Sequence, residues 1–368
     1  MSVERRSLAV VVAGGGTGGH LYPGVAVARE LLRRVPDACV SFAGTARGLE
    51  ARVIPKEGFE LDLIRSAGIK GKSLASRLRG AALLPVGFAD AWRILSRRRP
   101  QVVIGVGGYS SGPVVLTAAI RGIATMVLEQ NAVPGLTNRL LARWVRAAAV
   151  TFEETLTHFP GRGFVAGNPV RSEFFAIGDA PHVRDRSSRA RVLVLGGSQG
   201  ARGINLALVA AAPELARRQA DLEIVHQAGE RHLAEVRQGY ERAGVAARVV
   251  AYLDAVADEM KSADLVIARA GATTLAELAA AGRPAVLVPF PAATDDHQRR
   301  NARVVEAAGG AKVVEESELA DSRRIVEVVD GLLGDPARLA TMSRAMRGLA
   351  RPDAAARIVD RVLELAGG

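Results

Sequence analysis

The chain has 368 residues, of which 49% are hydrophobic and 24% charged, a composition that excludes disordered, collagen-like and integral-membrane proteins. At roughly 150 residues per domain, this length predicts two domains. The net charge of +11 indicates an anionic partner, namely a phosphate-bearing substrate, a membrane surface or a nucleic acid. Aromatic residues make up only 4%, too few for the stacking surfaces of single-stranded nucleic-acid binders. Cys39 is the only cysteine, which excludes internal disulfides and favours the cytoplasm.

Two segments share one pattern, in which a β-branched apolar run leads into a glycine-rich turn and then a helical pattern. They are residues 8–19 and residues 191–200, and each is typical of the first strand, loop and helix of a parallel sheet. Further runs expected to be strands follow at βαβ spacing: 38–44, 102–106, 125–128 and 147–150, then 222–226, 265–268 and 284–289. We therefore predict an α/β protein of two tandem doubly wound, Rossmann-like domains.

Turn residues and mixed charge without periodicity predict an interdomain linker at 171–190. The linker separates an N-terminal domain, 1–170, from a C-terminal domain, 191–350. A final helix is expected within 351–368, and its apolar spacing allows it to cap either domain, packing back on the first being one option. The N-terminal apolar run ends in glycines instead of a cleavage site, and no run reaches the ~18 residues of a spanning helix.

The first glycine loop, GGGTGGH at 14–20, follows a predicted strand, where small residues let backbone N–H groups approach a phosphate or a sugar. A dinucleotide site would also need an acidic residue at the end of the second strand, which instead reads Ala43-Gly44-Thr45. NAD(P) is therefore disfavoured. His20 lies where the loop meets its helix, as a helix-end hydrogen bonder or as a residue that contacts ligand.

The segment 265–277 has two interpretations, both based on a strand followed by a small-residue turn and a helix. In the structural one, Thr274 is the N-cap and Glu277 completes a capping box. In the functional one, the helix N-terminus binds a diphosphate and Glu277 accepts hydrogen bonds from ribose hydroxyls.

The segment TDDHQ at 294–298 is likewise open to two interpretations. Asp295 or Asp296 can cap the following helix. No further ligand pattern supports a metal site, so we expect no metal, whereas Gln298 and the two aspartates suit sugar hydroxyls.

Between 69 and 79 basic side chains lie beside leucines, and an apolar stretch that ends at Trp92 follows; such a mixture is typical of interfacial membrane contacts. A solvated loop before a core helix is the alternative.

Seven motifs in order along the chain resemble those of the MurG family of peptidoglycan glycosyltransferases. They are GGGTGGH at 14–20, GGYSSGP at 107–113, EQNAVPGLTN at 129–138, GNPVR at 167–171, GGSQGA at 196–201, RAGATTLAEL at 269–278 and DDHQ at 295–298. The resemblance covers essentially the whole chain. It implies a GT-B fold with the active site in the cleft between the glycine loops, and transfer of N-acetylglucosamine (GlcNAc) from UDP-GlcNAc to the C4 hydroxyl of the muramic acid of undecaprenyl-diphospho-MurNAc-pentapeptide, with inversion.

The same resemblance implies roles for individual residues. Donor contacts would be Thr17, Gly18, Gly19, Asn131, Arg171, Ser198, Leu253, Ala272, Thr273, Thr274, Leu275, Ala276, Glu277 and Gln298. On the half that the family assigns to the lipid acceptor, the membrane and acceptor surface would include Lys70, Lys72, Leu74, Arg77, Leu78, Arg79, Phe88 and Tyr109. The implied protein is peripheral on the cytoplasmic face of the membrane, binds no nucleic acid, requires no cofactor besides the donor substrate, and works beside cell-wall synthesis and division proteins.

The attacking hydroxyl needs a general base, for which His20 and Glu129 are the two candidates. Departure of UDP puts negative charge on the β-phosphate, so helix N-termini, Ser198 and Arg171 are expected to stabilise it. Three other functions remain open: a UDP-GlcNAc 2-epimerase, a nucleotide-sugar-binding module without catalysis, and a nucleic-acid binder with steep salt dependence.

Overall fold

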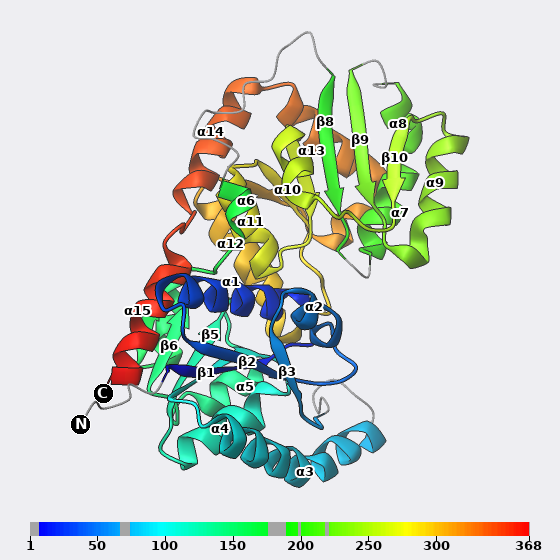
Figure 1. Cartoon of the computed structure of the whole chain (residues 1–368). Helices are drawn as coiled ribbons and strands as arrows, with labels where there is room; N and C mark the ends of the chain where they lie inside the picture. Colours follow the sequence, from blue (N-terminus) through cyan, green and yellow to red (C-terminus); the bar gives the residue numbers. More distant parts are fainter. Residues whose placement is uncertain (1–6, 67–73, 176–188, 198–199, 218–220, 368) are drawn as a thin grey trace, which may run out of the picture. The chain divides into compact units, whose positions relative to one another are not determined.

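The computed structural model describes residues 7–66, 74–175, 189–197, 200–217 and 221–367; the side chains of residues 74–82 and of Thr294 lie outside the described part. The chain divides into two units. Unit 1 comprises Met1–Arg171 and Arg351–Gly368, and unit 2 comprises Ser172–Ala350. Each unit is built around its own parallel sheet (Figure 1).

The described part of unit 1 contains a seven-stranded sheet in the order β3-β2-β1-β4-β5-β6-β7, with every pair parallel. Its strands are β1 (Ala9–Gly14), β2 (Cys39–Gly44), β3 (Glu60–Leu63), β4 (Val102–Gly107), β5 (Ala124–Glu129), β6 (Ala147–Val150) and β7 (Gly163–Val165). Its helices are α1 (Gly18–Arg34), α2 (Glu50–Lys56), α3 (Leu74–Arg98), α4 (Ser111–Ile120), α5 (Leu136–Leu141) and α15 (Ala354–Gly367), with the 3₁₀ helix η1 at Glu153–His158.

Strand β1 shows how the sheet of unit 1 is buried on both faces. Val10 and Val12 pack into one apolar core with α1 and α15, whereas Val11 and Ala13 pack into a second core with α3 and α4. Such alternation is the period of two expected of a strand. Figure 1 shows α1 on one side of the sheet and α3 and α4 on the other. Unit 1 therefore has three layers, with helices on both faces of its sheet.

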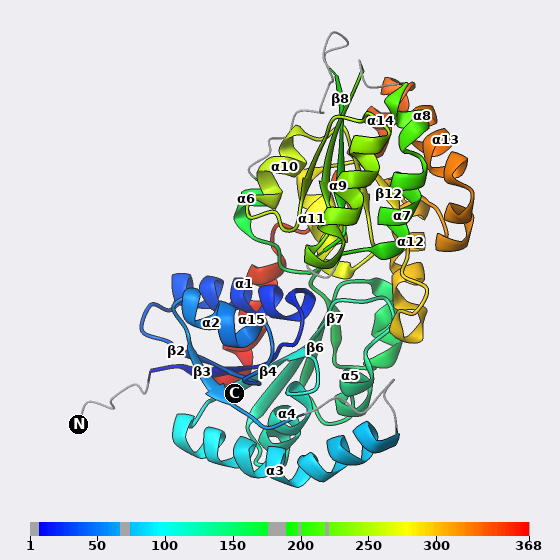
Figure 2. The ribbon, with the colours of Figure 1, turned by 90° about the vertical axis from the view of Figure 1, so that its right-hand side faces the viewer.

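The described part of unit 2 contains a six-stranded parallel sheet in the order β10-β9-β8-β11-β12-β13. Figure 2 shows helices of this unit on both sides of β8. Its strands are β8 (Ala190–Leu195), β9 (Leu222–Gln227), β10 (Ala247–Val250), β11 (Leu265–Ala268), β12 (Ala285–Leu287) and β13 (Ala311–Val313). Its helices are α6 (Ser172–Phe175), α7 (Arg202–Ala210), α8 (Ala212–Ala216), α9 (Leu233–Arg242), α10 (Val256–Ser262), α11 (Ala272–Ala281), α12 (His297–Ala307), α13 (Ser322–Leu333) and α14 (Pro336–Gly348). Short 3₁₀ helices are η2 (Glu230–His232), η3 (Thr294–Asp296) and η4 (Glu316–Ala320).

In both sheets the strand order reverses beside the first strand, between β1 and β4 in unit 1 and between β8 and β11 in unit 2. Connections leave such a point in opposite directions, and ligands of open α/β sheets bind there, outside the carboxyl ends of the strands. The loops after β1, β4 and β11 contain Thr17, Tyr109 and the start of α11. Three other predicted residues follow neighbouring strands: Asn131 follows β5, Leu253 follows β10 and Gln298 follows β12.

The predicted fold class, two doubly wound α/β domains, is confirmed. All nine predicted apolar runs are strands, although the run at 284–289 is shorter, since β12 ends at Leu287. Four described strands lacked a prediction: β3, β7, β10 and β13. Each is an edge strand of three or four residues. The last helix, α15, packs on unit 1, where Ile358, Val359 and Val362 are buried in the core beside α1.

Candidate active site

The first glycine loop of unit 1 is organised by the buried carboxylate of Glu50, at the start of α2. One carboxylate oxygen accepts the backbone N–H of Gly16 at 2.8 Å, and the other accepts the N–H and hydroxyl of Thr45 at 2.9 and 2.8 Å. Gly15 has a φ of +144°, and a Cβ there would lie 2.5 Å from the same carboxylate. The loop conformation therefore requires both the glycine and Glu50.

His20 lies in the first turn of α1, directly after this loop. Its backbone N–H and that of Leu21 bond to the carbonyl of Thr17, the N-cap residue. The imidazole ring lies against Gly107 at the end of β4, where a Cβ would be 2.8 Å from Nδ1. Nδ1 itself is 3.1 Å from Oε1 of Gln130, the residue after β5. The carboxyl ends of three neighbouring strands, β1, β4 and β5, thus converge on the ring of His20.

Glu129, the second candidate base, is 3% exposed, and hydrogen-bond donors contact both of its oxygens. Oε1 accepts the backbone N–H of Asn131 at 3.0 Å; Oε2 accepts the N–H of Gly135 at 3.0 Å and Nδ2 of Asn138 at 2.9 Å. These donors already engage both carboxylate oxygens, so Glu129 organises the loop after β5. Of the two candidates, the geometry favours His20.

The other predicted donor contacts of unit 1 surround the N-terminus of α1. Thr17 is exposed, and its side chain makes no capping bond; Gly18 and Gly19 begin the helix and are partly buried. The guanidinium of Arg171 lies 5.4 Å from the ring centroid of Tyr22, on α1. The ring of Tyr109, after β4, is 51% exposed.

The helix that contains Glu277 begins three residues earlier than the capping-box interpretation requires, so that interpretation is wrong. α11 begins at Ala272, its N-cap is Gly271, and no side chain caps it. Thr274 is therefore a helical residue of the first turn. Glu277 lies three residues further, on the same face, and both side chains are partly buried.

The remaining members of this predicted set in α11 differ in exposure: Ala272 and Leu275 are buried at 7% and 4%, whereas Thr273 and Ala276 are partly exposed. The backbone N–H groups of a first turn have no acceptor within their own helix. The start of α11 therefore presents N–H groups beside the side chains of Thr273, Thr274 and Glu277.

Gln298 lies at the start of α12 in unit 2. Its Oε1 accepts the backbone N–H of Phe290 at 3.0 Å, which joins the helix to the turn after β12 and leaves the amide nitrogen as donor. Asp296 occupies the N-cap position but makes no side-chain cap. Its carboxylate instead pairs with Arg299 at 3.0 Å, so the proposed capping role of the aspartate side chain is wrong for Asp296.

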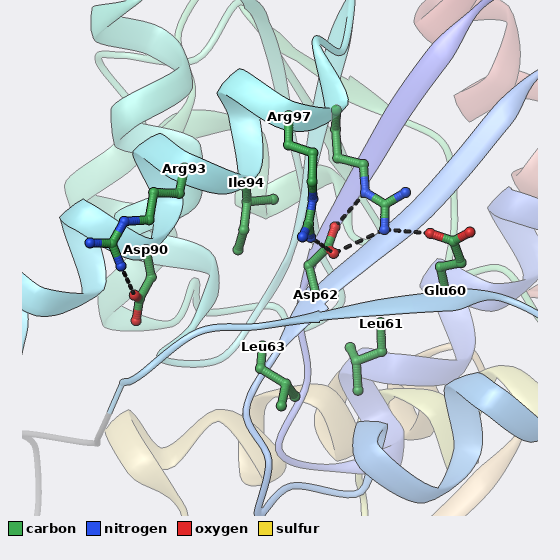
Figure 3. Close-up of a pocket in the computed structure, with 9 residues that line it drawn as sticks. Glu60, Leu61, Asp62, Leu63, Asp90, Arg93, Ile94 and Arg97 are labelled. Atoms are coloured by element: carbon green, nitrogen blue, oxygen red, sulfur yellow. Dashed lines mark hydrogen bonds and ion pairs between the residues drawn. The ribbon is translucent and has the colours of Figure 1, made fainter.

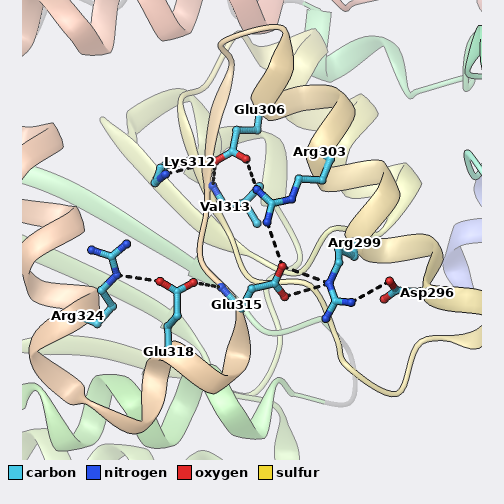
Figure 4. Close-up of polar contacts among 9 residues, drawn as sticks. All are labelled: Asp296, Arg299, Arg303, Glu306, Lys312, Val313, Glu315, Glu318 and Arg324. Atoms are coloured by element: carbon cyan, nitrogen blue, oxygen red, sulfur yellow. Dashed lines mark hydrogen bonds and ion pairs between the residues drawn. The ribbon is translucent and has the colours of Figure 1, made fainter.

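An ion-pair network holds this start of α12 in place (Figure 4). Arg299 and Arg303 both bond to Glu315, and Arg303 also pairs with Glu306 at 2.6 Å. Glu306 accepts the backbone N–H of Val313 at 2.9 Å, which ties α12 to β13. The network fixes the helix from which Gln298 projects.

Leu253, after β10, is 4% exposed, so its side chain is largely inaccessible to a ligand and a contact would involve its backbone. The adjacent Tyr252 is 55% exposed. Ser198 lies outside the described residues.

Arg269 was not among the predicted site residues. It donates to the carbonyls of Val288 and Pro289 at 3.2 and 3.3 Å, pairs with Glu316 and lies 5.3 Å from the ring centroid of Phe290. It therefore braces the turn after β12, the same turn that Gln298 contacts.

The predicted membrane segment is only partly described. Lys70 and Lys72 lie outside the described residues, as do the side chains of Leu74, Arg77, Leu78 and Arg79 on the first turns of α3. Further along α3, Phe88 is partly buried, whereas Leu84 and Trp92 are 38% and 54% exposed.

A pocket of about 660 Å³ lies between the edge strand β3 and α3 (Figure 3). It contains none of the predicted site residues, and its charges are internally paired: Arg97 and Arg98 bind Asp62, and Arg93 faces Asp90 at 3.9 Å. Within the described ranges, no group of three or more His, Cys, Asp or Glu residues could hold a metal ion. No helix in that part of the chain is long and apolar enough to span a membrane.

Residues 10–150 match the glycosyltransferase family 28 N-terminal domain, and residues 191–358 match its C-terminal domain. The UDP-N-acetylglucosamine--N-acetylmuramyl-(pentapeptide) pyrophosphoryl-undecaprenol N-acetylglucosamine transferase of Myxococcus xanthus is 45% identical over 97% of this chain and 92% of the relative. The chain belongs to the MurG family of glycosyltransferases. The crystal structure of Acinetobacter baumannii MurG superposes with a TM-score of 0.77 at 29% identity, over 97% of this chain and 99% of that one.

The MurG family assignment agrees with the GT-B architecture of two Rossmann-like units. The fold is shared more widely. UDP-GlcNAc 2-epimerase from Neisseria meningitidis, bound to UDP-GlcNAc, has a TM-score of 0.69 over 97% of this chain and 99% of that one, at 15% identity. At that identity the similarity concerns the fold alone, so it does not favour an epimerase.

Proposed function

We propose that this chain transfers GlcNAc from UDP-GlcNAc to the C4 hydroxyl of the muramic acid in undecaprenyl-diphospho-MurNAc-pentapeptide (lipid I), forming lipid II with inversion at the anomeric carbon. The observation that carries the proposal is the match of nearly the whole chain, at 45% identity, to a relative named for this transfer. The epimerase is supported only by fold similarity at 15% identity.

His20 is the proposed general base. An inverting transfer needs one group that removes the proton of the attacking hydroxyl as the bond to the anomeric carbon forms. The position of His20 supports this role: it lies at the strand-order reversal of unit 1, next to the glycine loop held by Glu50. Histidine is the side chain that most often serves as a general base in enzymes.

The leaving UDP gains negative charge on its β-phosphate, and the start of α11 is the proposed site that stabilises it. Oriented N–H groups and the positive end of the helix dipole favour an anion there. Glu277, one turn further, is proposed to accept hydrogen bonds from the ribose hydroxyls. The amide nitrogen of Gln298 is proposed to donate to the GlcNAc hydroxyls, because its Oε1 is already bonded to Phe290. Arg171 and Ser198 are further proposed donors to the diphosphate.

The proposed location is the cytoplasmic face of the cell membrane, with the enzyme bound as a peripheral protein near cell-wall synthesis and division proteins. Exposed apolar side chains of unit 1 support a membrane-docking surface: Leu84 and Trp92 on α3, and Ile120, at 65% exposure, on α4. Arg121 lies 4.7 Å from the ring centroid of Trp92, so a cation accompanies this apolar group. Apolar groups beside cations are suited to anionic headgroups.

One assay separates the candidate functions. The purified protein is incubated with UDP-GlcNAc labelled in the sugar, with and without a short-chain lipid I analogue. The proposed function requires label in the lipid product and release of UDP only when the acceptor is present. Formation of UDP-N-acetylmannosamine without acceptor would identify the epimerase, and binding of UDP-GlcNAc without turnover in either arm would identify a binding module.

A further inference from the structure

We propose that Gln130 is a positioning residue that selects the tautomer of His20, with the hydrogen on Nδ1 and the lone pair on Nε2. The role of that lone pair in accepting the proton of a sugar hydroxyl rests on the proposed function. The tautomer itself follows from hydrogen bonds within unit 1.

The orientation of the Gln130 amide is fixed by a backbone carbonyl. Gln130 is 3% exposed, and its Nε2 lies 3.2 Å from the carbonyl oxygen of Val106, on β4. A carbonyl oxygen only accepts hydrogen bonds, so the amide nitrogen must face Val106. The reversed amide would place two oxygens in contact, both without a hydrogen. Oε1 of Gln130 consequently faces His20.

An amide oxygen also only accepts, which decides the protonation of the neighbouring ring. Nδ1 of His20 is 3.1 Å from Oε1 of Gln130, so Nδ1 must carry the hydrogen. A neutral imidazole has a single N–H, and Nε2 is then the nitrogen with the lone pair. None of the hydrogen bonds among the described residues engages Nε2 of His20. The basic nitrogen is thereby left for a substrate.

The backbone keeps the ring within reach of Gln130. Gly107 has a φ of +100°, and a Cβ there would lie 2.8 Å from Nδ1 and 3.0 Å from Cε1 of His20. Only glycine leaves this space for the ring. Strand β4 ends at Gly107, β5 ends just before Gln130, and the two strands are hydrogen-bonded neighbours. The ring is therefore held between two adjacent strand ends, and the Gln130 amide determines which ring nitrogen carries the hydrogen.

The test reads the tautomer directly. The protein is labelled with ¹⁵N in its six histidines, and long-range ¹H–¹⁵N correlations assign the tautomer of each neutral ring. The His20 signals are identified by their absence from a His20→Gln variant. We expect the Nδ1–H form in the unaltered protein and a mixture of both tautomers in Gln130→Met, whose side chain has a similar shape but neither donates nor accepts at these positions. An Nε2–H ring in the unaltered protein, or unchanged signals in Gln130→Met, would overturn the proposal.

Kinetics supply a second readout. In Gln130→Met, kcat should fall about tenfold while KM for UDP-GlcNAc stays within about twofold, because only the base is affected. Gln101→Met is the matched control: it also removes a glutamine that bonds to the sheet, to the N–H of Ala9 at 2.7 Å, but from the opposite end of β4. Its His20 tautomer should not change. Should Gln130→Met fail to fold, Gln130→Asn retains a buried amide too short to bridge Val106 and His20 and should give the same mixture.

The spectra and the turnover assay test the two proposals independently. If the protein does not use lipid I, the tautomer measurement still tests the role of Gln130. If the tautomer is wrong, transfer to lipid I still stands on its own assay.

Discussion

The carboxylate of Glu50 accepts the backbone N–H of Gly16 at 2.8 Å, across 34 residues of sequence. This bond joins the start of α2 to the glycine loop that precedes His20. Glu50 is 1% exposed and also binds Thr45, so its loss removes the acceptor of three donors, one on the exposed Gly16 and two on the partly buried Thr45.

Replacing Glu50 by Gln should therefore disturb both stability and activity. The amide can accept at one position only, and its NH₂ group faces donors at the other, so we expect a loss of about 1–3 kcal/mol in the free energy of unfolding. The glycine loop should also lose order, which lowers kcat/KM. Urea denaturation and steady-state assays measure the two effects. Glu57→Gln is the control: Glu57 is the C-cap residue of α2, partly exposed, and pairs with Arg29 away from the glycine loop. Equal effects of the two substitutions would show that Glu50 does not support the loop.

His20→Ala should reduce kcat by about 10²–10⁴-fold with little change in donor binding, since it removes the proposed base. Glu129→Gln should behave differently, because it disrupts the buried loop after β5 and mainly lowers the melting temperature. The exposed His158→Ala is the control. Near-normal kcat in the His20 variant would exclude that residue from proton transfer.

Glu277→Ala should weaken UDP-GlcNAc binding more than it weakens the fold. α11 has no capping box, so the substitution does not remove hydrogen bonds that cap the helix. Losing a hydrogen bond from a ribose hydroxyl to a charged acceptor should cost about 1.5–3 kcal/mol, roughly 10- to 100-fold in Kd. Calorimetric titration with UDP and thermal denaturation separate the effects. A lower melting temperature with unchanged Kd would make Glu277 purely structural.

Reversing the charges of Lys70, Lys72, Arg77 and Arg79 to Glu should release the protein from anionic vesicles. Each cation near such a surface contributes about 1 kcal/mol, and added salt should weaken the same binding. The control reverses four exposed arginines of unit 2, Arg231, Arg242, Arg338 and Arg344, for the same change in net charge. Vesicle sedimentation decides: equal release by both variants would indicate net charge, and no release by the first would place docking elsewhere.

His226 makes the stability of unit 2 depend on pH. Burial lowers the pKa of His226 to about 3, and its ring nitrogens lie 3.1 Å from the Tyr240 hydroxyl and 3.0 Å from Oδ1 of Asn205. Between an ordinary pKa of about 6.5 and this value, the unfolded chain binds a proton that the folded chain does not. Above a pH of about 6.5 neither the folded nor the unfolded chain binds this proton, so unit 2 keeps its full stability. At lower pH the free energy of unfolding decreases, by up to about 1.4 kcal/mol per pH unit.

Denaturation of the unaltered protein and of His226→Gln between pH 7 and 5 checks this dependence. The difference in stability between the two should shrink as the pH falls. Far-UV circular dichroism is the appropriate signal, because both tryptophans, Trp92 and Trp144, belong to unit 1. A constant difference over this range would contradict the expectation. The control is His158→Gln at an exposed position, for which the difference from the unaltered protein should stay constant.

The central strands and glycine loops could be read from sequence because their signals are local. A strand buried on both faces is a continuous apolar run, as in Val102–Gly107, and turns at positive φ favour glycine. The edge strands β3 and β13, with sequences ELDL and AKV, have one neighbour each and include polar residues, so no such run marks them. The start of α11 was misplaced because Thr274 fits an N-cap by type, whereas the backbone turns at Gly271.

The sequence by itself determined the fold class, the two glycine loops and the motifs that carry the family resemblance, because these depend on short-range pattern and residue type. Only the tertiary structure decided that α15 packs beside α1, that Glu129 is enclosed by donors, and that Gln130 faces His20. Residues 20 and 130 lie 110 positions apart and meet because β1, β4 and β5 are neighbours in the sheet. Strand order arises from packing of the whole chain, so no local pattern specifies which side chains it brings into contact.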